Sequence, residues 1–264
     1  MNFFHVPSEV NRSFIENKKY YTIHMDFNGF LLAIIVTIGF SIDVLIVAIS
    51  TKRIGSVATL FLWQIMGIPL FALLVPIMPP IPVVTHIPLI MIIGVCFTFV
   101  GLIFLQAIKI GTLAVVSTIN ELFIVVTTLL GVVMLHESFT LWKAIGLILT
   151  FAGVVLLGFQ IPRKNSGSIR LLAGVPYALI SAIGTGIYLF AVAITSRMDG
   201  WFLTALFIRV AIAMTSCIVL LTRKYDFSLL SKKTPWVLLA LAAAVDVGAF
   251  SLYNYAISHY EVST

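Results

Sequence analysis

The stretch "GFLLAIIVTIGFSIDVLIVAISTKRIG" (Gly29–Gly55) contains one charged side chain, Asp43, before its basic end at Lys52 and Arg53. A helix that spans a membrane needs roughly 20 mostly apolar residues, so this stretch predicts a transmembrane helix. An aspartate at mid-bilayer costs at least about 2.5–3.5 kcal/mol on insertion scales. Asp43 is therefore a candidate functional residue as well as an exception to the apolar pattern.

Seven further apolar runs of similar length follow along the chain. The eight runs cover 29–50, 56–78, 87–108, 112–135, 140–159, 171–195, 201–222 and 235–257. Hydrophobic residues make up 61% and charged residues 10% of the 264, against roughly 45–50% and 25% in soluble domains. The two-residue alternation of a membrane β-barrel is not seen. The sequence therefore predicts an all-α, multi-pass membrane protein.

The remaining composition excludes several function classes. The net charge of +6 sits mostly in short connecting stretches, which indicates membrane topology and no nucleic-acid partner. Cys96 and Cys217 lie in apolar runs without a CxxC pattern, so they are expected to be small hydrophobic residues. The histidines show no metal-ligand spacing, and neither a cofactor nor a metal is predicted. Residues 1–28 are polar, lack a signal-peptide cleavage pattern, and are expected to form a short tail.

The chain contains an internal repeat. A shift of 145 positions carries Gly29–Gly55 onto "GVPYALISAIGTGIYLFAVAITSRMDG" (Gly174–Gly200) without a gap. Matched glycines and a matched basic end are harder to obtain by chance than matched apolar residues. We therefore expect a first five-helix repeat at 29–159, a basic linker at 160–170 and a second repeat at 171–264. An odd number of helices inverts the second copy relative to the first, and such folds bind substrates at the repeat interface.

The second repeat ends early. At a shift of 149, Ala107-Ile108 meets Ala256-Ile257, after which the first copy continues for two more helices and the second has only "YEVST". The pattern predicts a sequence truncated before its ninth and tenth helices, by about 45 residues. The alternative is a native eight-helix protein.

The block "LQAIKIGTLAVVSTINELFIVVTTLLGVVMLHESFTLWKAIGLILTFAGVVLLG" (Leu105–Gly158) resembles the EamA-type branch of the drug/metabolite transporter superfamily. A third helix ends there in an Ala-containing turn, a fourth ends in Leu135-His136-Glu137, and a Gly-rich fifth follows. "SLYNYAI", at the end of the eighth run, is similar to the corresponding turn of the second copy. The resemblance spans most of Gly29–Thr264, and its motifs are patterns of small residues.

This resemblance implies ten helices in two inverted five-helix repeats around a central cavity. It also implies export or exchange of small metabolites, often amino acids, by a protein of the cell membrane with a cytoplasmic N-terminus. That orientation places fewer lysines and arginines inside than outside, against the positive-inside rule. The sequence departs from many relatives at Asn120-Glu121-Leu122, where they have a proline after the acidic position.

Three acidic residues inside the predicted helices are candidates for binding substrate or protons. Asp43 lies on one helix face with Gly39, and a small residue one turn before a polar one allows close helix approach. Asp43 either faces a cavity or has a structural hydrogen-bonding role. Glu121 could exchange protons or hold a substrate's ammonium group; alternatively it is a protonated packing residue. Asp246 lies near the middle of its helix and is either a cavity carboxylate or an ion-paired structural residue.

Neutral polar residues complete the candidate site. Tyr188 is the repeat counterpart of Asp43, Asn120 adjoins Glu121, and Tyr253 and Asn254 follow Asp246 by two turns. These groups can line a polar site without the cost of a buried charge. Arg209 is interpreted as structural, paired with a lipid phosphate or a carboxylate.

The hypothesis that follows is a secondary transporter of amino acids or related amphiphiles, working by alternating access between the repeats. Its expected partners are a small-molecule substrate, membrane lipids and protons, in a monomer or homodimer. A non-transporting membrane subunit and a carrier of another class, such as nucleotide sugars, are the alternatives. No nucleophile motif or phosphate loop is found, so an enzyme is not predicted and no catalytic residue is proposed.

Overall fold

A computed structural model describes residues 27–75, 84–135, 139–158, 174–223, 225 and 233–259. The predicted tail, except for its last two residues, and the whole of the predicted linker 160–170 lie outside the described residues. So do residues 260–264, where the second repeat was predicted to stop, and the pair His136-Glu137.

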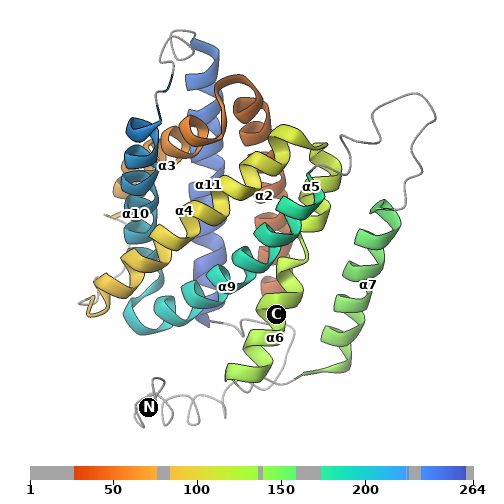
Figure 1. The fold of residues 1–264 in the computed structure, drawn as a ribbon. Coiled ribbons are helices and arrows are strands. Elements are labelled where there is room, and N and C mark those ends of the chain that lie inside the picture. The colour runs from red at the N-terminus through yellow and green to blue at the C-terminus, as the bar shows by residue number, and fades with distance from the viewer. Residues whose placement is uncertain are drawn as a thin grey trace, which may run out of the picture.

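Every regular element in the described residues is an α-helix (Figure 1). The helices are α2 (Phe27–Ile54), α3 (Ser56–Leu74), α4 (Ile87–Ile110), α5 (Leu113–Asn120), α6 (Phe123–Leu135), α7 (Leu141–Gly158), α9 (Val175–Asp199), α10 (Trp201–Thr222) and α11 (Lys233–His259). Seven stretches of the described chain are long and apolar enough to cross a membrane, one of them formed by α5 and α6 together, and α7 adds a shorter apolar helix. The predicted all-α, multi-pass membrane fold is confirmed.

The fourth predicted helix is broken in the middle. Helix α5 ends at Asn120 and α6 begins at Phe123. The backbone N–H of Leu122 donates to the carbonyl of Ile119, and that of Ile124 to the carbonyl of Glu121, both at 3.1 Å. Bonds that reach back three residues tighten the helix and disturb its regular bonding. The predicted span 112–135 is therefore confirmed as one membrane-crossing stretch, and it is interrupted at Glu121 and Leu122 although this sequence has no proline there.

Two matched glycines form matched turns. Gly55 joins α2 to α3 and Gly200 joins α9 to α10, and both have φ of 85°. This backbone conformation is strained for residues with a Cβ. The two glycines are the pair that the 145-residue shift superimposes, so the sequence match has the same structural counterpart in both halves.

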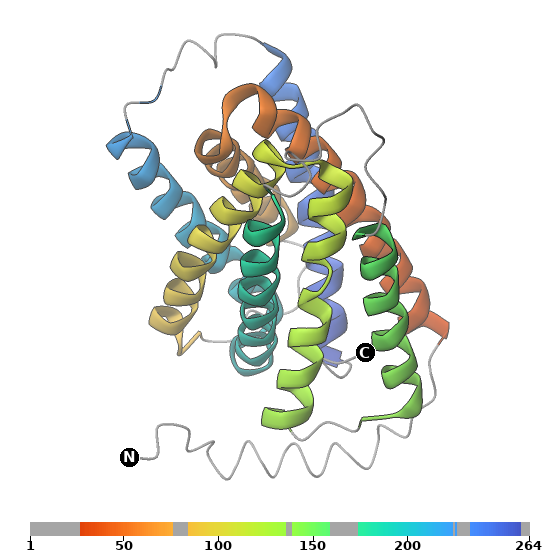
Figure 2. The same cartoon turned by 45° about the vertical axis from the view of Figure 1, so that its right-hand side comes forward.

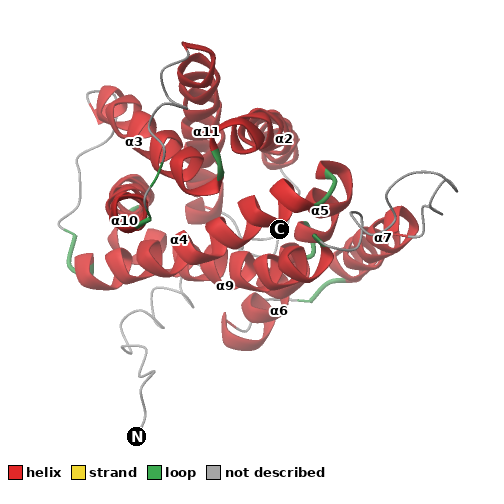
Figure 3. Cartoon of the chain, turned by 45° about the horizontal axis from the view of Figure 1, so that its top comes forward, coloured by secondary structure: helices red, strands yellow, loops and turns green. Residues whose placement is uncertain are grey.

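The helices of the two halves of the chain pack on one another. Helix α2 packs most extensively on α11, α3 on α10, and α4 on both α9 and α10. Figures 2 and 3 show α9 and α11 running between helices from the first half. The main apolar core is formed by residues of both halves, among them Phe71, Ile90, Val192 and Ile208. Helix α7 stands at the edge of the bundle, where it contacts α5 (Figure 1).

Small residues bring these helices close together. A Cβ added to Gly39 of α2 would lie 2.8 Å from the Cβ of Ala249 in α11. A Cβ on Gly94 of α4 would lie 2.6 Å from the Cβ of Ala211 and 2.8 Å from the carbonyl oxygen of Ile208, both in α10. The close approach predicted at Gly39 is confirmed, and its partner is α11.

The Gly94→Ala substitution should destabilise the bundle. The added methyl group would meet the backbone carbonyl of Ile208, which cannot rotate away as a side chain can. Such overpacking typically lowers the free energy of unfolding by about 1–3 kcal/mol. We expect a lower thermal unfolding temperature in detergent. Gly153→Ala in α7, where a Cβ meets nothing within 4 Å, is the matched control and should unfold like the wild type. Equal unfolding temperatures for both variants would contradict the close contact.

Candidate functional site

Three charged side chains from three helices meet in the core of the bundle. Asp43 of α2, Arg209 of α10 and Asp246 of α11 are 2%, 3% and 6% exposed. Arg209 Nη2 donates to Asp246 Oδ2 in a buried ion pair. Asp43 is repelled by the charge of Asp246 and attracted by that of Arg209. These three residues are called the charged cluster below.

Helix α3 positions the arginine of the charged cluster. Gly67 leaves room for the side chain, because a Cβ there would lie 2.8 Å from the guanidinium carbon. One turn further on, the ring of Phe71 lies under the guanidinium, with 5.2 Å between its centroid and that carbon. Such stacking stabilises a cation away from water. Arg209 is thus held within the protein. Of the two partners predicted for it, a lipid phosphate and a carboxylate, the structure shows the carboxylate.

The charged cluster has polar atoms that find no partner in the described protein. They are Oδ1 of Asp43 and the Nε and Nη1 atoms of Arg209, all buried. Ser251 Oγ, five residues after Asp246 on α11, is also buried without a hydrogen-bond partner. Buried polar groups are nearly always hydrogen-bonded. Free acceptors and free donors therefore remain together in one place, which is the composition of a site that binds a polar molecule.

Two tyrosines lie next to the charged cluster. The hydroxyl group of Tyr188 is close enough for the charges of Asp246 and Arg209 to act on it, and Tyr253 acts on it as well. The ring of Tyr188 stacks on Phe97 of α4, with 3.7 Å between centroids, and that of Tyr253 meets Phe40 of α2 edge-on at 6.2 Å. Tyr188 thus lies beside Asp246 and Arg209, and Tyr253 lies beside Tyr188, so that both predicted tyrosines add aromatic surface to the site.

The two predicted asparagines link helices. Asn120 accepts a hydrogen bond from Ser181 of α9 at 2.9 Å. Asn254 is fully buried, accepts from Ser196 of α9 at 3.1 Å, and donates to the carbonyl of Phe250 at 2.7 Å. These bonds fix α5 and α11 against α9, so both asparagines have structural partners in this conformation.

The structure places Glu121 apart from the charged cluster. It lies in the break between α5 and α6, and its side chain is exposed. None of the charged groups of the cluster acts on it. The described residues therefore bring together four of the seven predicted site residues: Asp43, Tyr188, Asp246 and Tyr253.

Asp199, which the sequence analysis did not single out, ties α9 to the start of α4. It is 1% exposed and accepts hydrogen bonds from the backbone N–H groups of Thr85 and His86, at 3.0 and 3.2 Å. The Thr85 hydroxyl also donates to it, at 2.9 Å, and the His86 ring lies 3.0 Å away. Asp199 thus binds the two backbone N–H groups that directly precede α4, whose N-cap residue is His86. The feature of the sequence that could have indicated this role is the position of Asp199 near the end of a predicted helix, directly before Gly200.

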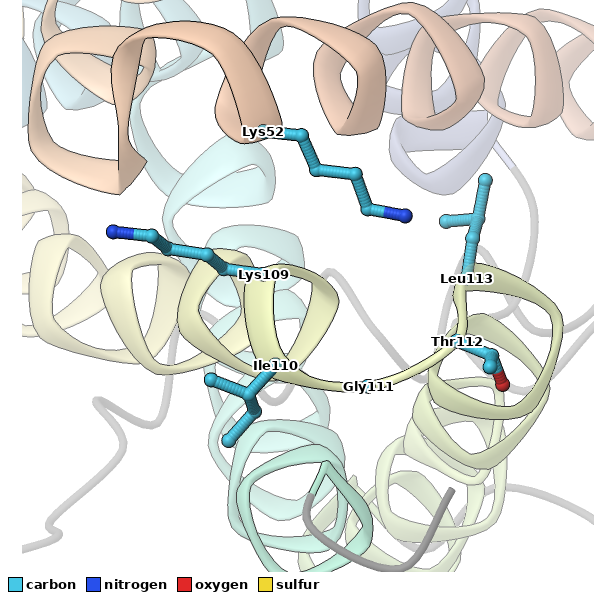
Figure 4. A pocket seen from close by; sticks show the side chains of 6 residues that line it. All are labelled: Lys52, Lys109, Ile110, Gly111, Thr112 and Leu113. Carbon is cyan, nitrogen blue, oxygen red and sulfur yellow. The ribbon is translucent and has the colours of Figure 1, made fainter. Parts of the chain in front are cut away.

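A separate cavity of about 370 Å³ lies at the end of α2, lined by Lys52, Lys109, Ile110, Gly111, Thr112 and Leu113. Figure 4 shows both lysines extended along the space between α2 and α4. Lys52 is nine residues from Asp43, about 14 Å along the helix axis. This cavity is thus a basic surface at one end of the bundle, distinct from the charged cluster.

Residues 27–159 match the model of the EamA-like transporter family. The matched segment begins within two residues of the first predicted repeat and ends with it, and it covers half of the chain. No curated protein sequence matches the chain significantly.

Removing single members of the charged cluster should destabilise the protein in a set order. Arg209→Gln leaves both buried acids without a cation, and breaking the buried pair with Asp246 costs about 3–5 kcal/mol. Asp246→Asn should cost less, because Arg209 keeps Asp43 as a counter-charge. We expect the thermal unfolding temperature in detergent to be lower for Arg209→Gln than for Asp246→Asn. Ser41→Ala, on the exposed face of α2, is the control. The reverse order would show that Asp43 does not use Arg209 as a counter-charge.

Proposed function

Since the chain belongs to the EamA-like transporter family, we propose that it is a secondary transporter that exports or exchanges small amphiphilic metabolites, amino acids among them. It works as a carrier and not as an enzyme. The observation that supports this proposal best is the charged cluster. Charged side chains inside a membrane protein are costly and commonly mark a substrate or ion pathway.

The substrate class follows from the chemistry of the charged cluster. A free carboxylate oxygen on Asp43 can accept from an ammonium group, and the free nitrogens of Arg209 can donate to a carboxylate. Tyr188, Tyr253 and Phe97 supply aromatic surface for an apolar part of the same molecule. Ammonium, carboxylate and side chain are the three parts of an amino acid, and each would meet a group suited to it.

Alternating access is the proposed mechanism. Asp43 comes from the first predicted repeat, while Arg209 and Asp246 come from the second, so a substrate bound among them would touch both. Inverted repeats that rock against each other expose such a site first to one side of the membrane and then to the other. The small residues Gly39 and Ala249 give α2 and α11 a smooth contact surface, which favours a sliding movement.

Transport by purified protein in proteoliposomes tests the proposal. We expect saturable counterflow of at least one of radiolabelled leucine, phenylalanine and lysine. Asp246→Asn should reduce it about tenfold or more, because loss of one partner of a buried charge pair costs more than the roughly 1.4 kcal/mol that a tenfold change represents. Ser41→Ala should transport like the wild type.

The same assay with Glu121→Gln separates two versions of the site. If Glu121 belongs to the pathway although it stands outside the charged cluster, its variant loses transport as well. If Glu121 is a packing residue, only the Asp246 variant loses transport. Normal transport by both variants would refute the proposed site. Absence of counterflow for every probe would favour another substrate class or a non-transporting subunit.

A further inference from the structure

The charged cluster contains two carboxylates and one cation. Four charged side chains of the described residues are buried, namely Asp43, Asp199, Arg209 and Asp246. Asp199 is held at the end of α9 by Thr85 and His86. Arg209 is therefore the one buried cation that the described core offers to both Asp43 and Asp246. If both acids are ionised, the cluster carries one negative charge in excess.

The excess charge is located on Asp43. Arg209 makes its hydrogen bond to Asp246, while Oδ1 of Asp43 has no hydrogen-bond partner in the described chain. Asp246 also repels Asp43. A carboxylate buried without a partner is strongly unfavourable. It must therefore take up a positive charge from outside the protein.

We infer that Asp43 is a proton-exchange site, at which a proton and the ammonium group of a substrate compete for the same carboxylate. The inference rests on the proposed function for its substrate. Without substrate, Asp43 carries a proton and the charged cluster is neutral. When an amine binds, the O–H bond of Asp43 breaks, its proton passes to water on the open side, and the ammonium N–H groups donate to the carboxylate. Release of the amine reverses both changes, so that one proton is exchanged for each substrate cation.

Few other groups can alter this balance. The charged residues that act on Asp43 are Arg209 from α10 and Asp246 from α11. Tyr188 of α9 lies beside these two, and Tyr253 of α11 lies beside Tyr188. Helices α3 and α5 contain no titratable residue in their described parts. In α4, Cys96 is exposed and Lys109 lies at the helix end. Among the described residues, Arg209 is thus the one buried cation that competes with a proton for Asp43.

Infrared spectroscopy of purified full-length protein tests the proton site directly. A protonated carboxyl group has a carbonyl band that differs from that of a carboxylate and shifts in heavy water. We expect a band that titrates with pH and is lost in Asp43→Asn. Asp246→Asn should also lose it at neutral pH, because Arg209 then neutralises Asp43. Ser41→Ala should retain it. A band that survives in both acid variants would overturn the inference.

Proton release tests the competition. Phenylalanine added to weakly buffered protein should release about one proton per bound amine, read with a pH indicator, and N-acetylphenylalanine, which has no ammonium group, should release none. Asp43→Asn should bind phenylalanine without releasing a proton, or fail to bind it. If that variant does not fold, Asp246→Asn provides the same comparison. Binding by the wild type without proton release would overturn the inference.

The two proposals fail differently. Counterflow of leucine, phenylalanine or lysine together with an unchanged carboxyl band in Asp43→Asn would leave the transporter and remove the proton site. A titrating band that depends on Asp43, without counterflow of any probe, would leave the proton site and remove the proposed function.

Discussion

The pairing of Arg209 with Asp246 inside the bundle is the interaction on which the rest of the site depends. In an apolar interior an unpaired charge is very costly, so each ionised group needs a counter-charge within reach. Arg209 is the counter-charge for both acids, but it forms its hydrogen bond with Asp246. Asp43 on α2 is then left with an oxygen that nothing in the described protein satisfies. Both the proposed substrate site and the proposed proton site follow from that shortage.

The fold places Arg209, Asp246 and Asp43 so that one of the two acids lacks a hydrogen-bonded counter-charge. Gly67 admits the guanidinium next to α3, and Phe71 covers one of its faces. Gly39 lets α2 approach α11 so closely that Asp43 comes under the influence of Asp246. Hydrogen bonds at Asn120, Asn254 and Asp199 hold α5, α11 and α4 against α9. Small and neutral polar residues therefore position the charged side chains of the cluster.

The four acids Asp43, Glu121, Asp199 and Asp246 differ in their surroundings. Glu121 stands in the break between α5 and α6 with an exposed side chain. Asp199 is buried but fully used by the backbone and side chains of Thr85 and His86. Only Asp43 and Asp246 face a cation in the core. Burial alone thus does not distinguish Asp43 from Asp199; the supply of hydrogen-bond partners does.

The sequence by itself determined the all-helical membrane fold, the helix positions to within a few residues and the equivalence of Gly55 and Gly200, which the structure shows to be two matching turns. Hydrophobic length and glycine conformation are local properties, and they can be read one segment at a time. It also selected Asp43, Asp246 and the two tyrosines, because polar residues are rare in such segments. Only the tertiary structure decided that Arg209 belongs with them and that Glu121 does not. Which helix faces which neighbour depends on side-chain packing between distant segments, and no local pattern encodes it. The break after Asn120 was not predicted for the same reason. No proline marks it in the sequence, and the break lies where α5 and α6 pack on α9.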